Sequence, residues 1–359
     1  MKTKNIILLT LLIILLIIGY FYIQSENSYS VKICKWKDDK AAAISISFDD
    51  ASYVQYKYAL PVLEDLGFKA SFGLVGEWTK ETPSYSAEPG IFEIKKMGWN
   101  EIREISKKGH EICAHGYKHE RYSRRISSDS LIHQMKKIKN LIEKNIGSEC
   151  YTLHYPYSQT SDTITYAAKK SGFLFARSGE EAINPSTPKN MQLLASKAIY
   201  NNEVPALKEF KNFLKEASGG WLILMYHHLF PDDSKEMGIL RYHKIRNTYS
   251  LLPSTFKSQM NLIKNTNYWV APISTVGKYI EERDNLKIES KKFFNIINIK
   301  TKINLDTSIY DERVTLKIGL PWKKASVFFE DKKYIFDVVE GYILLNILPG
   351  DNIMIKKII

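Results

Sequence analysis

Apolar and polar positions follow two different periodicities along the 359 residues of this chain. Between residues 41 and 229, short apolar runs alternate with segments whose apolar residues recur three and four positions apart, a pattern that predicts buried strands and amphipathic helices in turn. The predicted strands cover residues 41–48, 69–76, 110–115, 151–157, 173–179 and 221–228. The predicted helices cover residues 56–67, 100–109, 131–147, 163–172 and 210–220. This alternation predicts an α/β fold, a parallel sheet or barrel with the helices outside.

From about Glu282 onward the apolar residues recur with a period of two. Apolar residues occupy every second position of one predicted strand: Val314, Leu316, Ile318 and Leu320. Turn signals follow at residues 330–333 and 340–341. The pattern predicts a small antiparallel β domain over residues 282–359. This domain carries no cluster of catalytic residue types, so a structural or carbohydrate-contacting accessory role is all that its sequence indicates.

The first residues form a charge-free apolar run from Ile6 to Ile23, preceded by Lys2 and Lys4. As a helix this run would span about 27 Å, close to the hydrocarbon thickness of a bilayer. Basic residues ahead of the run predict a cytoplasmic N-terminus and an extracytoplasmic remainder. No small-x-small cleavage site follows, which favours an uncleaved transmembrane anchor over residues 1–25, with cleavage and secretion as the alternative. We expect a linker at 26–40 and a catalytic domain at 41–281.

Composition narrows the class of protein. A hydrophobic content of 44% and an aromatic content of 12% indicate a globular chain with a substantial core. The net charge of +12 is spread along the sequence and no nucleic-acid motif accompanies it, so we expect no nucleic-acid partner. A basic surface remains compatible with anionic lipids or acidic cell-wall polymers. Three cysteines provide neither a disulfide framework nor a thiolate metal site.

Two groups of residues suggest chemistry at the strand ends. Asp49 and Asp50 follow the first strand, and neighbouring side chains on a strand point to opposite faces. His115 and His119 lie four residues apart, a spacing that on a helical turn places both imidazoles on one face. One Asp with two His supplies three ligands of a catalytic zinc-type site, and the other Asp could then serve as a base. Separately, each group is also typical of a solvated turn or of an unrelated histidine pair.

The stretch from Ala41 to Leu229 resembles the polysaccharide deacetylase family, whose members hydrolyse N- or O-acetyl groups of carbohydrates. The family's motifs correspond to Ser47-Phe48-Asp49-Asp50, to Gly109-His110-Glu111-Ile112-Cys113-Ala114-His115 with His119, to His154-Tyr155-Pro156-Tyr157-Ser158, and to the strand "WLILMYH" ending at His227. The resemblance implies a distorted (β/α) barrel of the polysaccharide deacetylase type. Together with the patterns above, it gives an α/β fold with an N-terminal transmembrane helix and a C-terminal antiparallel β domain.

The resemblance also implies roles for individual residues. Asp49 would be the general base, and three residues would bind a divalent metal: Asp50, His115 and His119. Histidine and carboxylate ligands suit Zn²⁺ best, with Co²⁺, Ni²⁺ or Mn²⁺ as alternatives. His227 would be the general acid, with His228 as its competitor.

The third motif would contact the substrate. The backbone N–H of Tyr157, after Pro156, would bind the oxyanion, and Tyr155 would contact the sugar. The family arginine that orients the base is replaced by His154. We expect Arg177, at the end of the next strand, to supply the missing cation. Two other positions depart from the family pattern, where Ala51 replaces a glycine and Glu120 replaces a proline.

These features predict a metal-dependent hydrolase that removes acetyl groups, most simply N-acetyl groups, from an extracytoplasmic carbohydrate. An O-acetyl esterase acting on xylan or another glycan and a non-catalytic carbohydrate-binding protein remain as alternatives. The expected partners are an acetylated glycan and, through the N-terminal helix, a membrane. The sequence leaves the glycan and the oligomeric state open.

Overall fold

The computed structural model describes Ile14 and residues 28–87, 93–122, 126–199, 204–231 and 250–358. The chain divides into two compact units. One consists of residues 40–280 and is called the α/β unit below. The other combines Met1–Asp39 with Glu281–Ile359 and is called the β unit.

The α/β unit contains a parallel sheet. Its strands are β2 (Ala42–Phe48), β3 (Ser71–Leu74), β6 (Glu111–Ala114), β7 (Thr152–His154), β8 (Phe175–Arg177), β9 (Lys197–Ala198), β10 (Trp221–Tyr226) and β13 (Tyr268–Val270). They are ordered β8-β7-β6-β3-β2-β10-β9, with β13 also paired to β2, and every pair is parallel. The predicted α/β class is therefore confirmed.

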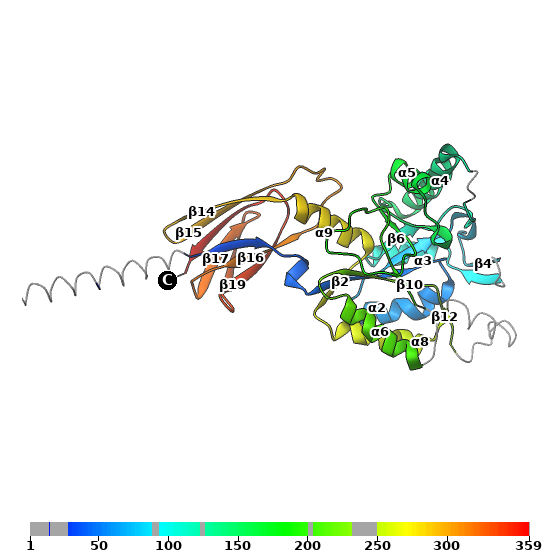
Figure 1. Ribbon diagram of the computed structural model, residues 1–359, viewed down its shortest axis with the longest axis horizontal. Helices are drawn as coiled ribbons and strands as arrows, with labels where there is room; N and C mark the ends of the chain where they lie inside the picture. The colour runs from blue at the N-terminus through cyan, green and yellow to red at the C-terminus, as the bar shows by residue number, and fades with distance from the viewer. Residues whose placement is uncertain are drawn as a thin grey trace, which may run out of the picture. The chain divides into compact units, whose positions relative to one another are not determined.

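Helices cover the outside of this sheet. They are η2 (Gln55–Ala59, π-helical), α2 (Leu60–Leu66), α3 (Trp99–Lys107), α4 (Ser128–Ile146), α5 (Asp162–Lys170), α6 (Val204–Glu216), α8 (Pro253–Lys264) and α9 (Ile273–Asn285). Figure 1 shows α4 and α5 above the strands and α2, α6 and α8 below them. The central strands β2 and β10 are buried at every position because both of their faces are covered.

The sheet curls until residues 191–198 connect its two edges. At one edge, Ala176 of β8 donates a backbone hydrogen bond to Met191, 2.7 Å, and Leu194 forms a bridge with Arg177. At the other edge, Lys197 in β9 pairs with Leu224 of β10. The arrangement is a curled parallel sheet of the (β/α)-barrel kind.

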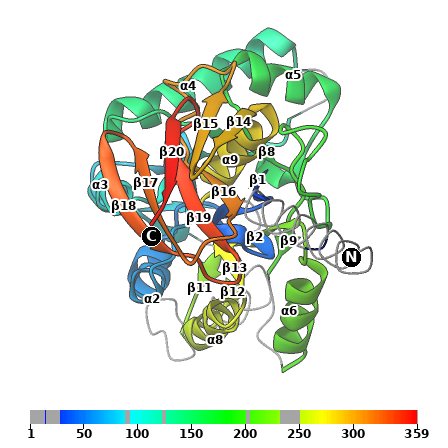
Figure 2. The ribbon, with the colours of Figure 1, turned by 90° about the vertical axis from the view of Figure 1, so that its left-hand side faces the viewer.

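The β unit contains two antiparallel sheets. One comprises β1 (Ser30–Ile33), β16 (Val314–Gly319) and β19 (Tyr342–Ile347). The other comprises β14 (Lys287–Phe293), β15 (Ile296–Lys302), β20 (Asn352–Lys357), β17 (Lys324–Phe329) and β18 (Lys332–Asp337), visible side by side in Figure 2. The predicted C-terminal antiparallel β domain is confirmed, and its alternating apolar residues Val314, Leu316, Ile318 and Leu320 are all buried.

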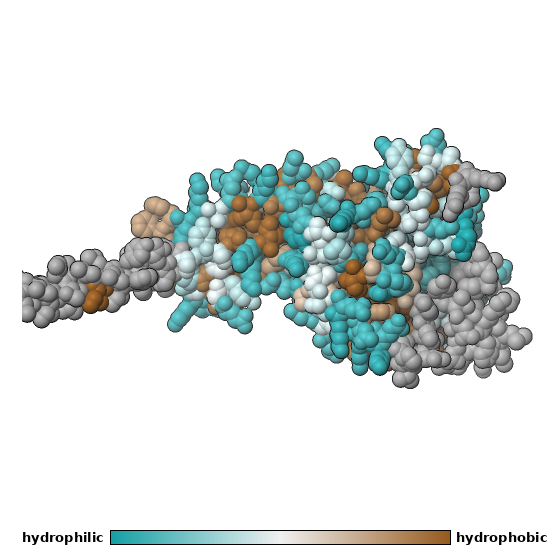
Figure 3. Space-filling view, viewed as in Figure 1, coloured by the Kyte–Doolittle hydropathy of each residue, from teal (hydrophilic) through white to brown (hydrophobic). Residues whose placement is uncertain are grey.

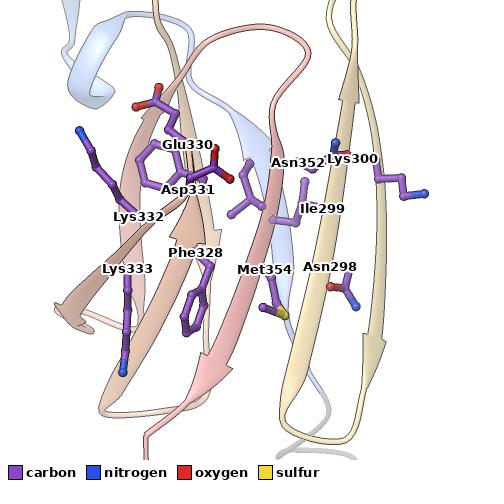
Figure 4. A pocket seen from close by; sticks show the side chains of 12 residues that line it. Asn298, Ile299, Lys300, Phe328, Glu330, Asp331, Lys332, Lys333, Asn352 and Met354 are labelled. Atoms are coloured by element: carbon purple, nitrogen blue, oxygen red, sulfur yellow. The ribbon is translucent and has the colours of Figure 1, made fainter.

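One sheet of this unit exposes its outer face to solvent. A hollow of about 710 Å³ lies on the outer face of the five-stranded sheet. Figure 4 shows Phe328, Met354 and Asn298 side by side there, with the β17–β18 turn above them. The row of alternate side chains that lines it is the solvent-facing half of the period-two pattern.

The N-terminal segment differs from the expected linker over residues 26–40. It contains β1, which pairs antiparallel with β16 from Ser30↔Gly319 to Ile33↔Leu316. A strand of four residues at a sheet edge carries too little apolar periodicity to be recognised, since only its partner defines it. Within the described residues, no helix combines the length and apolar content needed to cross a bilayer. Apart from Ile14, the anchor expected over residues 1–25 lies outside those residues.

Candidate active site

Parallel strands bring the predicted site residues to one edge of the α/β unit. Each candidate lies at or directly after the carboxyl end of a strand: Asp49 and Asp50 after β2, His115 after β6, His154 in β7, Arg177 in β8 and His227 after β10. The strand registers align these ends, with Tyr226 beside Phe48 and His154 beside Arg177. The carboxyl edge of a parallel α/β sheet is where ligands usually bind.

Three atoms form a nearly equilateral triangle. Asp50 Oδ1 lies 3.5 Å from His115 Nε2 and 3.5 Å from His119 Nε2, and the two Nε2 atoms are 3.2 Å apart. A tetrahedral ion bound at about 2.0–2.1 Å by each ligand separates the ligand atoms by about 3.4 Å. The triangle therefore has the dimensions of a tetrahedral metal site with one open position.

The protonation of the triangle also fits a cation. His115 Nδ1 lies 2.9 Å from the carbonyl oxygen of His154, which can only accept, so Nδ1 carries the proton. In the neutral ring Nε2 is then left as a lone pair aimed at the triangle. Asp50 Oδ1 is buried, and no hydrogen-bond donor in the described part of the chain reaches it. A divalent cation would satisfy both atoms.

The backbone around the triangle adopts left-handed conformations. The φ angles are 72° at Asp50, 50° at Ala51 and 53° at His119. Such angles are costly for residues other than glycine and persist where the surrounding structure holds them. The turn after β2 aims Asp49 and Asp50 at different partners. The expectation of a helical turn between His115 and His119 is wrong, because Gly116 (φ 80°) and His119 bend a loop instead.

Two aromatic rings enclose His119. Its imidazole centroid lies 4.8 Å from the Trp78 ring and 4.7 Å from the Tyr157 ring. Each of these two rings also contacts a cation, with Lys96 Nζ 4.2 Å from the Trp78 centroid and the Arg121 guanidinium 4.3 Å from that of Tyr157. Sequence reasoning missed Trp78 and Lys96, because neither belongs to a predicted strand or to a motif. The contact of Trp78 with His119, and of Lys96 with Trp78, exists only in the folded chain.

Asp49 is held by two cationic or polar side chains. Arg177 Nη2 donates to both carboxylate oxygens, at 2.6 Å and 2.5 Å, and His154 Nδ1 donates to Oδ1 at 2.8 Å. Burial by itself would raise the pKa of Asp49, but the charge of Arg177 and the neighbouring histidines hold that pKa well below its usual range. Burial, together with Arg177, lowers the pKa of His154 to about 4, so this ring is a neutral donor. Asp49 is thus an ionised acceptor.

His227 completes the site at the end of β10. Its Nε2 atom lies 3.7 Å from Asp49 Oδ2, and 16% of its side chain is exposed. Burial lowers the pKa of His227, and the charges of Asp49 and Asp50 oppose that shift. The competing His228 is buried, with its ring 5.5 Å from Phe230. Of the two histidines, His227 is the one beside Asp49.

A buried glutamine, Gln55, ties these strand ends together. Its Nε2 atom donates to the carbonyl oxygens of Asp49, at 2.6 Å, and His227, at 2.7 Å. These bonds span β2 and β10 and fix the backbone on both sides of the proposed base. No sequence signal singled out Gln55, which lies in the π-helical turn η2.

Comparison with known proteins identifies the family. The family model of polysaccharide deacetylase matches residues 37–176. This part of the chain matches a polysaccharide deacetylase domain. A gellan lyase from a Bacillus species is 21% identical to this chain over 308 residues, which cover 80% of this chain and only 11% of that protein.

Three solved structures are also similar. One is the Xyl-CE4 domain of a multidomain xylanase from the hindgut metagenome of Trinervitermes trinervoides, with 17% identity, a TM-score of 0.42, and coverage of 66% of this chain and 89% of that one. A deacetylase from Streptococcus pyogenes in complex with acetate has 20% identity and a TM-score of 0.41, covering 48% and 70%. A CE4 family pseudoenzyme from Bacillus anthracis has 15% identity and a TM-score of 0.42, covering 66% of each chain.

The polysaccharide deacetylase motifs take an altered form in the third strand-end loop. His154 occupies the position of the family arginine, and Arg177 reaches Asp49 from the adjacent strand, where the two residues are paired in register. The left-handed φ of Ala51 is the conformation that a glycine, usual at this position in the family, adopts most readily.

The remaining third-motif residues fall into two environments. Tyr157 has a left-handed φ of 54° and packs against His119 beside the triangle. Pro156 precedes it and is buried. Tyr155 is only 1% exposed and belongs to the hydrophobic core. The expected contact of Tyr155 with a sugar is therefore corrected, because its ring lies inside the unit.

Proposed function

We propose that this chain is a metal-dependent hydrolase that removes N-acetyl groups from an extracytoplasmic carbohydrate. The observation that carries this proposal is that the two adjacent aspartates have different surroundings. Asp50 points at the two histidines of the triangle, whereas Asp49 is ionised and held by Arg177 and His154. Two adjacent carboxylates in such different surroundings suit one ligand and one base.

When bound in the triangle, a divalent ion would supply Lewis-acid chemistry toward the acetyl carbonyl and the attacking water. Zn²⁺ suits the donor set, and Co²⁺, Ni²⁺ and Mn²⁺ are alternatives. Asp50, His115 and His119 would hold the ion. The ring of His119 is kept in place by Trp78 and Tyr157.

The protein groups then move two protons. Asp49 accepts a proton from the attacking water, whose oxygen bonds to the carbonyl carbon. The backbone N–H of Tyr157 donates to the carbonyl oxygen as it gains negative charge. His227 gives a proton to the nitrogen when the C–N bond breaks, so that acetate and a free amine leave. An amine leaves poorly unless it is protonated, and the position of His227 beside Asp49 therefore favours N-acetyl over O-acetyl substrates.

Location and substrate complete the proposal. The uncharged run from Ile6 to Ile23 behind Lys2 and Lys4 supports a membrane-anchored chain with residues after 25 outside the cytoplasm. The substrate would then be an acetylated cell-wall or extracellular glycan.

The deciding experiment measures acetate release from a panel of N-acetylated and O-acetylated glycans by the full chain. Activity on N-acetylated members that a chelator abolishes and one divalent ion restores is the expected result. Preference for O-acetylated members would make the chain an esterase. Absence of release from every member, with metal bound, would make it a carbohydrate-binding protein.

A further inference from the structure

One end of the β unit gathers several strand ends and the start of the described chain. β14 turns into β15 there, and β20 finishes there because Ile296 pairs with Lys356. β17 begins at this end, since Ala325 pairs with Lys357. The end, called the hairpin end below, comprises residues 291–296, 320–324, 335–341 and 356–358.

The N-terminal segment enters the β unit at the hairpin end. β1 starts with Ser30, which pairs with Gly319, and Gly319 leads directly into the connection to β17. Tyr29 Oη lies 3.2 Å from Ser290 Oγ, one residue before the hairpin end begins in β14. The described chain ahead of β1 therefore begins at this side of the β unit.

Large apolar side chains are exposed at the hairpin end. Phe293 is 70% exposed and Phe294 77%, and their ring centroids lie 4.6 Å apart at the β14–β15 turn. Ile335 and Val339, on the β18 side, are 57% and 64% exposed. Figure 3 shows hydrophobic side chains projecting at the tip of the β14–β15 hairpin. Two contacting aromatic rings exposed in this way are typical of an interaction surface.

Lysines are the commonest charged residues of the hairpin end. They are Lys291, Lys292, Lys323, Lys324, Lys356 and Lys357. The acidic residues of the hairpin end are Asp337 and Glu340, and Asp337 already pairs with Lys324 at 3.3 Å. Exposed apolar rings among ammonium groups are typical of surfaces that enter the headgroup region of an anionic bilayer.

Covalent geometry brings this surface close to the expected membrane. The apolar run ends at Ile23, and the five residues to Ser28 can span at most about 18 Å. The headgroup layer on each side of the hydrocarbon core is itself about 5–8 Å thick. A chain anchored through this run therefore keeps the hairpin end at or near the lipid headgroups.

We infer that the hairpin end is a membrane-contact surface. Phe293 and Phe294 enter the bilayer interface, and the surrounding lysines bind the anionic headgroups of the same membrane that holds the N-terminal run. The lipid surface is favoured over a second copy of the chain because the hairpin end is strongly basic and two such surfaces repel. This inference rests on the anchoring part of the proposed function and is independent of the proposed chemistry.

Spin labelling of the full chain in vesicles tests the inference. The three native cysteines are buried and form no disulfide, so a cysteine introduced at the surface takes the label selectively. The labelled positions are Phe293→Cys and, as a matched exposed apolar control, Leu348→Cys in the β19–β20 connection at the other end of the unit. The vesicles contain phosphatidylcholine with phosphatidylglycerol, or phosphatidylcholine alone.

In anionic vesicles, the label at 293 should collide several-fold less with an aqueous nickel complex and more with oxygen than the label at 348. Lys291→Gln with Lys323→Gln should reduce this protection, whereas Lys300→Gln with Lys332→Gln, away from the hairpin end, should not. Equal aqueous accessibility of the two labels overturns the inference. A second copy of the chain is indicated if the label at 293 is protected equally in both lipids and its spectrum shows dipolar broadening as the protein density rises. That result also overturns the inference.

Two further measurements test the membrane anchor and the proposed chemistry separately. Retention of the full chain in the vesicle fraction at alkaline pH tests the anchor, and extraction of the chain would remove the basis of the inference. Acetate release by the same sample tests the proposed chemistry. A chain that is extracted but active refutes the membrane contact alone, and a chain that is retained and inactive refutes the chemistry alone.

Discussion

Arg177 and Asp49, from different strands, form a buried two-point contact in which Arg177 Nη2 lies 2.6 Å and 2.5 Å from the two carboxylate oxygens. Arg177 is 1% exposed, so the contact is made in the interior of the α/β unit. His154, paired with Arg177 in register, donates to the same carboxylate. The cation of the site has moved one strand along the sheet from the position that the family motif gives it.

Replacing this arginine should damage the proposed base without emptying the metal site. Arg177→Met should lower the rate of acetate release by about 10- to 100-fold, the usual effect of losing a supporting contact, while metal content stays near that of the wild type. It should also destabilise the fold by about 3–5 kcal/mol, because Asp49 keeps its buried charge without its main partner. Arg103→Met, at a surface ion pair with Glu81, is the control. Wild-type activity in Arg177→Met would separate Asp49 from catalysis.

Substitution of the two adjacent aspartates should impair different properties, catalysis for Asp49 and metal binding for Asp50. Asp49→Asn should retain the metal and lose nearly all acetate release, since only proton abstraction is removed. Asp50→Asn should weaken metal binding, and excess metal should partly restore its activity. Metal content and acetate release are measured on the same samples, with the exposed Asp65→Asn as control. Substantial deacetylation by Asp49→Asn would refute the assignment.

The rings beside His119 should control metal affinity. Tyr157→Leu or Trp78→Leu removes one wall of the imidazole and should weaken metal binding by about 10- to 100-fold. Trp78→Phe, which keeps a ring at that wall, should bind the metal more tightly than Trp78→Leu. Competition with a chromophoric chelator measures the affinity, and Tyr166→Leu, at an exposed tyrosine of α5, is the control. Unchanged affinity in both leucine variants would show that the rings are ordinary packing.

The loss of rate on replacing His227 should depend on the leaving group of the substrate. His227→Ala should slow release from N-acetylated substrates far more than from activated acetyl esters, whose leaving group needs little protonation. His228→Asn should affect both substrate types alike, because that ring packs on Phe230 away from Asp49. The ratio of the two rates in each variant is the readout. An equal loss on amides and esters in His227→Ala would argue against an acid role.

His110 should make stability depend on pH. Burial lowers its pKa to about 4, while Ala70 N–H donates to Nδ1 at 3.0 Å and Nε2 lies 3.0 Å from Glu64 Oε1. Since the unfolded chain has the higher pKa, about 6.5, it binds the proton first as the pH falls. The contribution of neutral His110 is therefore complete above pH 6.5 and falls by about 3 kcal/mol between pH 6.5 and 4.

Denaturant unfolding between these pH values checks this expectation. His110→Gln should show a shallower loss of stability than the wild type over that range, because glutamine does not titrate. His133→Gln, at an exposed position of α4, should follow the wild-type curve. Parallel curves for wild type and His110→Gln would place the titration elsewhere.

Much of the α/β unit was predictable because its signals are local. The strand "AAISISF" is apolar throughout, and a strand covered on both faces needs that composition. Gly147, with a φ of 73°, caps the C-terminus of helix α4, and a glycine at that position in the sequence predicts the end of a helix. The strands β9 and β13 were not predicted, since two or three residues each cannot show a period. They exist because β10 and β2 offer backbone partners.

The candidate site divides in the same way. The residue types at the strand ends, namely the Asp doublet, the two histidines and the histidine pair after β10, are properties of the sequence by itself, as is the change from helical to period-two patterning near Glu282. Only the tertiary structure decided that Arg177 lies beside Asp49, that Trp78 and Tyr157 enclose His119, and that β1 joins the C-terminal unit. Such contacts join residues far apart in the chain, and they depend on strand order and register, which residue patterns within one segment do not encode.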